Sequence, residues 1–115
     1  MNREKLTEFE KMISNRQMSQ ELIKSCLANL EPRISKAAYF KKKFAHAPEF
    51  ARGSHEYEFK TLIGYRNKLI RLLKPSLSLS EVQEEIKRIP KEDIVSIRVR
   101  DLVIELIDNG DYIIV

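Results

Sequence analysis

Residues 54–74, SHEYEFKTLIGYRNKLIRLLK, are the longest uninterrupted stretch of this chain with the period of an α-helix. A rotation of about 100° per residue places its apolar side chains on one stripe, which we expect to face the core. The opposite side carries cations, so this one helix is expected both to pack the fold and to display a positive surface. The stripe consists of Phe59, Leu62, Ile63, Leu69, Ile70 and Leu73, with Tyr65 and Leu72 at its edges.

The length and composition of the chain predict one folded domain. Of its 115 residues, 43% are hydrophobic and 33% are charged, which is the balance of a globular protein. We treat residues 1–115 as a single domain with N-terminal helices over residues 1–53. No apolar run approaches the ~20 residues of a membrane span, and the first residues are highly charged, so we expect a cytoplasmic protein without membrane contact. Cys26 shares a helical face with Leu22 and Leu30, which predicts a core residue rather than a reactive thiol.

The positive charge of the chain is concentrated in its middle part, although the formal net charge is only +4. Residues 33–74 hold eleven Lys or Arg against three Asp or Glu, whereas residues 75–115 hold five against nine. Such an imbalance is typical of a surface that binds phosphates or an acidic partner protein. The candidate nucleic-acid-binding residues are Lys36, Lys41, Lys42, Lys43, Lys60, Lys68, Arg71 and Lys74.

Two short helices are predicted in the first thirty residues. Residues 2–13 have apolar side chains at helical spacing with charged residues between them. Ser19 is a favourable N-cap for the second helix, and Met18 and Ile23 flank it in the arrangement of a hydrophobic staple. This second helix is expected to end near Leu30.

Pro32 is expected to separate that helix from the next one. A proline restricts the residue before it away from helical angles and is best tolerated in a first turn, so a third helix should begin at Pro32 and end near Phe44. Residues 46–53 contain a proline and a glycine and are expected to form a loop. Ser54 then caps the central helix, and Pro75 ends it.

Residues 94–108 fit two templates. Strict alternation in residues 95–100 and the pair Asn109-Gly110 favour a β-hairpin. A helix instead gathers the polar residues on one face and the apolar residues on the other, with the glycine just past its end. More positions obey the helical period, so we favour a helix followed by a short strand over residues 112–115.

These elements predict the fold class. A short extended piece over residues 77–79 and a helix over residues 80–88, which begins at Ser80, lie between the central helix and the C-terminal one. We expect a mostly α protein, a compact domain of four to six helices with a short C-terminal β element. An α+β fold with a C-terminal β-hairpin is the alternative.

Residues 96–110, SIRVRDLVIELIDNG, followed by Tyr112-Ile113-Ile114, resemble the third helix and first wing strand of winged helix-turn-helix domains. The pattern in that family is roughly Ser-x-Arg-x-Val-Arg-x-x-Ile-x-x-Leu with a glycine before the strand. One residue fewer separates Ser96 from Val99 here than in some members. The resemblance covers residues 55–115, and family members place the third helix in the major groove of DNA. It implies helices at residues 55–74, 80–88 and 95–108, with a short strand at 77–79.

Three acidic residues distinguish this third helix from one that reads DNA. Asp101, Glu105 and Asp108 would line it, where phosphate groups repel them. The resemblance therefore implies either a module that contacts proteins or a protein that binds nucleic acid through other surfaces.

The sequence contains no recognisable catalytic, cofactor or metal-binding pattern. His46 and His55 are separated by a predicted loop, and no second cysteine accompanies them, so we expect no metal site. The three glycines are isolated, which excludes the glycine-rich loops that bind nucleotide phosphates. We therefore expect a protein that is not an enzyme and has no cofactor.

Arg66 lies in the middle of the apolar stripe of the central helix. An unpaired charge is costly to bury, so its guanidinium is expected to find a partner or to reach solvent along its stem. It is either a structural ion pair with an acid of the C-terminal segment or an anchor that inserts into a partner protein.

Two functions from different classes remain. The leading hypothesis is a small nucleic-acid-binding or nucleic-acid-associated regulatory protein that contacts phosphates through its central basic surface, with Tyr39 or Phe40 stacking on bases. The alternative is an adaptor or inhibitor that binds an acidic protein surface. A homodimer is a natural form of this alternative, because the positive part 33–74 and the negative part 75–115 complement each other.

Overall fold

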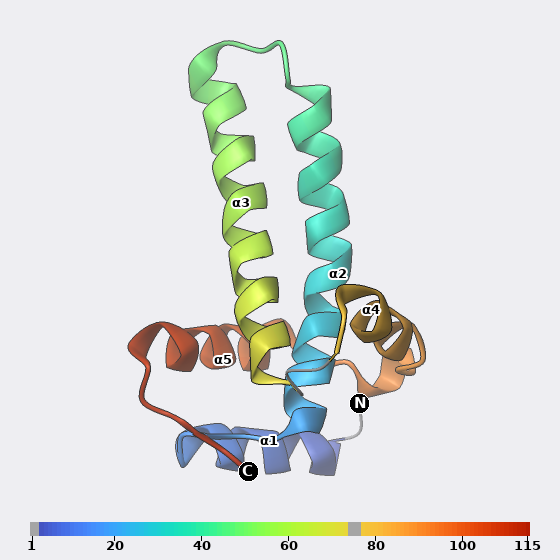
Figure 1. The fold of residues 1–115 in the computed structure, drawn as a ribbon. Helices are drawn as coiled ribbons and strands as arrows, with labels where there is room; N and C mark the ends of the chain where they lie inside the picture. The colour runs from blue at the N-terminus through green and yellow to red at the C-terminus, as the bar shows by residue number, and fades with distance from the viewer. Residues whose placement is uncertain (1–2, 74–76) are drawn as a thin grey trace.

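The computed structural model describes residues 3–73 and 77–115. These residues form five α-helices, a short 3₁₀ turn and two very short strands. The elements are α1 (Arg3–Ser14), β1 (Gln17–Met18), α2 (Gln20–Lys43), α3 (Glu49–Leu72), α4 (Leu79–Lys87), η1 (Lys91–Asp93), α5 (Ile97–Asn109) and β2 (Ile113–Ile114). Helices α2 and α3 stand side by side as a long hairpin that rises from a base of α1, α4 and α5 (Figure 1). The molecule measures 45 × 30 × 28 Å, so the hairpin projects well beyond its base.

The start of the chain folds as its local signals predict. The helix expected over residues 2–13 is confirmed as α1. The Ser19 N-cap is also confirmed, because its hydroxyl accepts a hydrogen bond from the backbone N–H of Leu22 at 3.1 Å. Met18 and Ile23, the predicted staple, are both fully buried.

The break expected at Pro32 is wrong. Helix α2 continues through Pro32 as one helix of 24 residues. Leu30, Ile34 and Ala37, on either side of the proline, are all buried. A proline inside a helix costs about 3 kcal/mol, and burial of several apolar side chains at about 25 cal/mol per Å² is enough to offset it. The side of α2 that packs on α3 therefore keeps the helix continuous where the local signal predicts an end.

The central helix starts earlier than the sequence indicates. It begins at Glu49, with Pro48 as its N-cap, so the loop expected at residues 46–53 is shorter and Ser54 lies inside the helix rather than capping it. The Pro48 carbonyl accepts hydrogen bonds from the backbone N–H groups of Ala51 and Arg52, and Glu49 lies near the positive end of the helix dipole. The expected end at Pro75 falls outside the described residues.

The second half of the base contains α4 and α5. Residues 77–79 are not an extended piece followed by a Ser80 start, because α4 already begins at Leu79 with Ser78 as its cap. For the C-terminal segment, the helix prediction is confirmed and the β-hairpin alternative is wrong. The Ser96 hydroxyl caps α5 by accepting a hydrogen bond from the Val99 N–H at 3.3 Å. Gly110 ends the helix in the left-handed region, with φ of 67°.

A two-residue strand follows α5, as the sequence predicts, but its partner is unexpected. Ile113 and Ile114 pair in parallel with Gln17 and Met18, which lie between α1 and α2. This partner was not predicted, because a two-residue strand in a polar connection shows no alternation. The fold is therefore mostly α, with five helices and a short C-terminal β element.

The core surrounds the first half of α2. Residues of that helix with almost no exposed surface include Leu22, Leu27 and Leu30. The other helices each contribute buried side chains to the same cluster: Phe9 and Ile13 from α1, Leu62 and Leu69 from α3, Val82 and Ile86 from α4, and Val99 and Val103 from α5. Within the described part of the chain, none of the helices combines the length and apolar composition that a membrane crossing needs.

Cys26 lies in this core and has no solvent exposure, which confirms its predicted role as a packed residue. Burial raises the pKa of its thiol to about 12. Only the thiolate attacks disulfide reagents, so at pH 8 a thiol with this pKa has a reactive fraction of about 10⁻⁴.

We therefore expect Cys26 of the native protein to react with an aromatic disulfide reagent over 100-fold more slowly than in ~6 M urea, because only the unfolded chain exposes an ordinary thiol. Absorbance of the released thiolate measures both rates. Rapid reaction of the native protein would show that this part of the core opens readily.

Candidate functional site

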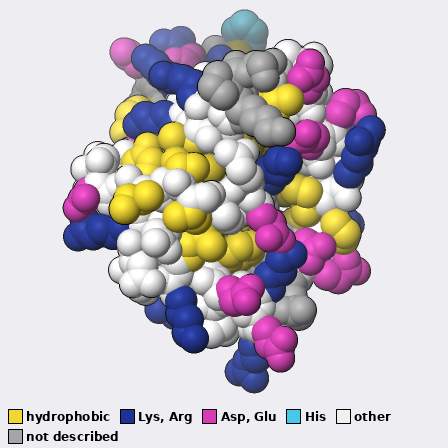
Figure 2. Space-filling view, turned by 60° about the horizontal axis from the view of Figure 1, so that its bottom comes forward, with side chains coloured by type: hydrophobic (Ala, Val, Ile, Leu, Met, Phe, Trp, Pro, Cys, Tyr) yellow, Lys and Arg dark blue, Asp and Glu magenta, His cyan; other side chains and the backbone are white. Residues whose placement is uncertain are grey.

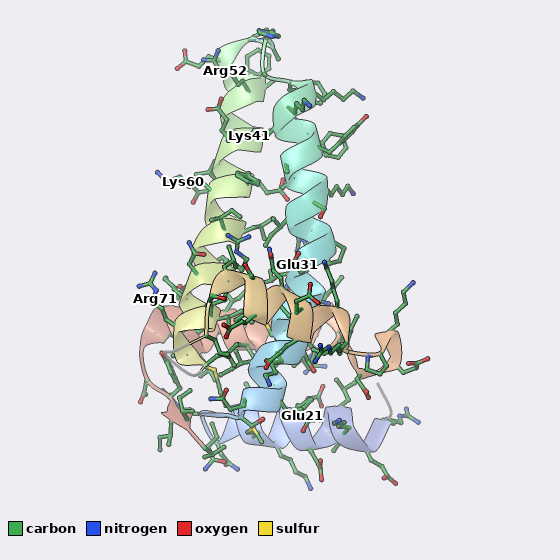
Figure 3. The ribbon with its side chains drawn as sticks, turned by 45° about the vertical axis from the view of Figure 1, so that its right-hand side comes forward. Glu21, Glu31, Lys41, Arg52, Lys60 and Arg71 are labelled. Atoms are coloured by element: carbon green, nitrogen blue, oxygen red, sulfur yellow. The ribbon has the colours of Figure 1, made fainter. Side chains whose placement is uncertain are left out.

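The cations predicted to bind nucleic acid lie along the α2–α3 hairpin. Lys36, Lys41, Lys42 and Lys43 belong to the second half of α2, towards the hairpin tip, and Lys60, Lys68 and Arg71 follow one another along α3. All seven side chains are exposed, and Lys74 falls outside the described residues. Lys60 and Arg71 project from the same side of α3, away from α2 (Figure 3). The cations therefore occupy the outer faces of both helices rather than one compact spot.

Most of these cations are not neutralised by the protein's own carboxylates. Lys68 is the exception, since its Nζ lies 3.2 Å from Oδ1 of Asp108 on α5. Within residues 3–73 and 77–115, the other six form no ion pair. The hairpin carboxylates Glu56 and Glu58 lie instead near two arginines, 3.6 Å from Arg52 and 3.8 Å from Arg33. The hairpin thus retains a positive surface that is free to attract phosphates.

Aromatic rings support the lysines at the tip. Phe44 stacks on His55 across the two helices, with ring centroids 4.6 Å apart, and Phe40 lies 5.7 Å from the same imidazole. The Nζ of Lys43 lies 5.8 Å from the Phe44 ring centroid, and Lys41 Nζ lies 4.7 Å from that of Phe59. A cation over a ring face is attracted by the ring quadrupole while its outer side stays in water. The rings therefore orient these ammonium groups without removing their charge.

Three aromatic side chains on the same hairpin point into solvent. Phe50 is 83% exposed, Tyr57 is 73% exposed and Tyr39 is 60% exposed. Of these three, only Tyr39 was expected to contact a ligand; Phe50 was expected in a loop, and Tyr57 lies opposite the core stripe of the central helix. The helical period, continued backwards from residue 54 to Glu49, would have placed both on the face opposite the core.

The arginine buried in the base is Arg100 rather than Arg66. The Arg100 side chain is only 3% exposed; it donates to Asp101 at 2.6 Å and to the amide oxygen of Asn29 at 3.2 Å. Arg66 is partly buried, and its Nε has no hydrogen-bond partner in the part of the chain that the structure describes. The ion pair that was expected between Arg66 and a C-terminal acid is not present among the described residues, and its role as a partner anchor stays a prediction.

A groove of about 630 Å³ separates the α3 side of the hairpin from α5. Its walls combine Tyr57 and Tyr65 with the acids Glu58, Glu105 and Asp108. Tyr65 donates a hydrogen bond to Asp108 at 3.2 Å; partial burial, with the charge of Asp108, raises the pKa of its phenol. The described residues contain no group of three or more acids, histidines or cysteines that could hold a metal ion.

Comparison of this chain with protein-family models, with curated proteins and with solved structures finds no match. The resemblance to winged helix-turn-helix domains is therefore untested and stays a prediction. The functional conclusion rests on the charges and shapes of the hairpin itself.

Proposed function

We propose that this chain is a non-enzymatic, nucleic-acid-binding regulatory protein that contacts phosphates through its α2–α3 hairpin. The observation that supports this proposal is a set of exposed hairpin cations that form no ion pair with any described residue, on an element that projects from the base: Lys36, Lys41, Lys42, Lys43, Lys60 and Arg71. A projecting element brings its charges to a polyanion without steric conflict from the rest of the protein. Contacts to phosphates bind every sequence alike, so the binding is weakly sequence-specific.

Salt dependence tests this proposal. The affinity for a fluorescein-labelled 20-nucleotide probe, single-stranded or duplex, is expected to fall steeply between about 50 and 200 mM salt, since each contacted phosphate releases a counterion. Charge reversal by Lys42→Glu or Arg71→Glu should weaken binding about tenfold and make the slope of log K against log salt shallower by ~1. Fluorescence anisotropy measures both quantities.

Lys11→Glu is the matched control, because Lys11 is an exposed cation of α1, outside the hairpin. It changes the net charge by the same amount and is expected to alter affinity by less than about twofold. Equal effects from Lys11→Glu and Lys42→Glu would show that only the overall charge matters. Absence of binding at about 50 mM salt would refute the proposed function.

A second candidate function is suggested by the C-terminal strand. Ile113, Ile114 and Val115 are exposed apolar residues, and apolar side chains gather on the underside of the molecule, away from the hairpin tip (Figure 2). A strand with one open edge can accept a strand from an acidic partner protein, for which this chain would be an adaptor or inhibitor, or from a second copy. Sedimentation separates the two functions: a monomer that shifts with nucleic acid supports the first, and a stable dimer that ignores it supports the second.

A further inference from the structure

One exposed face of α3 carries both rings and cations. The residues of this face, which we call the α3 track, recur at intervals of three, four or seven residues and therefore lie within about a quarter-turn of one another. The α3 track consists of Phe50, Tyr57, Lys60, Gly64, Lys68 and Arg71. Lys60 and Arg71 mark its direction in Figure 3, where both project from the side of α3 that faces away from α2. At a rise of ~1.5 Å per residue the track is about 30 Å long.

We propose that the nucleic acid bound by the hairpin is single-stranded and lies along the α3 track. This inference rests on the proposed function and specifies its ligand. Phe50 and Tyr57 expose most of their surface and lie two helical turns apart. The base faces of a single strand are available to stack on such rings, whereas those of a duplex are covered by neighbouring bases. Lys60 and Arg71 continue the same face and supply contacts for the phosphates, whereas Lys68 between them is paired with Asp108.

The shape of the hairpin also favours a single strand. The major groove of a duplex is ~12 Å wide and admits one helix, and each helix is ~10 Å across with its side chains. Helices α2 and α3 run side by side along their length (Figure 1), so the pair is too wide to lie in that groove. A duplex could contact only the outermost cations, and the exposed rings would then stay in water.

Gly64 provides an independent indication that a strand approaches this face. It lies in the middle of α3, where glycine destabilises a helix relative to alanine, yet a Cβ at this position would meet no atom within 4 Å. Packing within the protein therefore does not require a glycine here. Gly64 instead lines a shallow hollow of about 350 Å³ together with Tyr57, Lys60 and Lys68, where bare backbone lets a ligand come close.

The test compares a 12-nucleotide oligothymidine, the corresponding oligouridine and a 12-base-pair duplex, each labelled for fluorescence anisotropy. We expect either single strand to bind at least tenfold more tightly than the duplex. Phe50→Ala and Tyr57→Ala should each weaken single-strand binding about tenfold and leave duplex binding unchanged, because each removes one stacked base. Tyr57→Phe should keep the affinity. Ile97→Ala, which removes an exposed apolar side chain of α5 outside the hairpin, should change it by less than about twofold.

Gly64→Ala is expected to change stability and single-strand affinity in opposite directions. The added methyl group should raise the melting temperature, because it removes the helix penalty of glycine, while it weakens single-strand binding severalfold because it keeps the strand from approaching the bare backbone. Equal or tighter binding of the duplex, or ring variants that weaken both forms alike, would overturn the single-strand inference and leave the proposed function standing. Failure of all three probes to bind would overturn both.

Discussion

Replacement of Pro32 by alanine is expected to increase the free energy of unfolding by about 2 kcal/mol. Pro32 lies inside the continuous helix α2, where it has no N–H to donate to the carbonyl of Ala28 and its ring crowds the preceding turn. This costs about 3 kcal/mol relative to alanine. The unfolded chain of the variant is more flexible, which stabilises the unfolded state and reduces the expected increase by about 0.4–1 kcal/mol. Urea denaturation followed by circular dichroism measures the difference.

Pro48→Ala is the matched control for this experiment. Pro48 precedes the first turn of α3 with φ of −52°, so alanine gains no helical hydrogen bond there and only makes the unfolded chain more flexible. We expect Pro48→Ala to lower stability by about 0.5 kcal/mol. If Pro32→Ala also lowered stability, a helix boundary at Pro32, as the local sequence predicts, would be the better description.

The predictions that succeeded depend on neighbouring residues in the chain. Ser19 caps the start of a helix through a hydrogen bond within three residues, and Gly110 ends a helix through its own backbone angles, so the sequence alone identifies both. The helical period of residues 97–109 is equally local. It outweighed the alternation of residues 95–100 because it fits a longer stretch.

The predictions that failed depend on contacts between distant segments. Pro32 was expected to end a helix because the burial of Ile34 and Ala37 along the hairpin is not visible in the local sequence. The partner of β2 was missed for the same reason, since Gln17 and Ile113 are brought together by the packing of α5 against α1 and α2.

The candidate site was predicted in part. Charge counting identified the cations of the hairpin, because charge imbalance is a property of composition. It could not show that Lys68 is already paired with Asp108, since that contact joins α3 to α5. Phe50 was missed because the helix that exposes it starts five residues before the predicted cap at Ser54, whereas Tyr57 lies within the predicted helix and was missed because only the cations of its solvent-facing side were considered.

Arg66 and Arg100 show that a sequence pattern does not reveal which charged side chain is buried. Both lie among apolar residues of a helix, and only packing decides which is enclosed. Arg100 is enclosed between α5 and α2, where Asn29 accepts one hydrogen bond from it and donates another to the carbonyl of Val95. Asp101 supplies the only carboxylate paired with it among the described residues.

Removal of that carboxylate is therefore expected to cost more than removal of the arginine. Asp101→Ala leaves a guanidinium that is only 3% exposed without its counter-ion, and we expect the free energy of unfolding to fall by about 2 kcal/mol. Removing one partner of a fully buried pair costs about 3–5 kcal/mol, but the Asp101 side chain is 60% exposed, so the loss is smaller here. Arg100→Met removes the buried charge but keeps an apolar side chain of similar length, and the exposed Asp101 returns to water. We expect this variant to lose less than about 1 kcal/mol.

Urea denaturation of both variants, with Asp111→Ala as the control, tests this order. Asp111 pairs with Arg16 on the surface, and both side chains are more than half exposed, so its removal is expected to cost less than about 0.5 kcal/mol. A larger loss for Arg100→Met than for Asp101→Ala would mean that the hydrogen bond to Asn29 dominates the contribution of Arg100. The contact between α2 and α5 would then depend on the amide of Asn29 rather than on neutralisation of a buried charge, and Asn29→Ala would be as damaging as Arg100→Met.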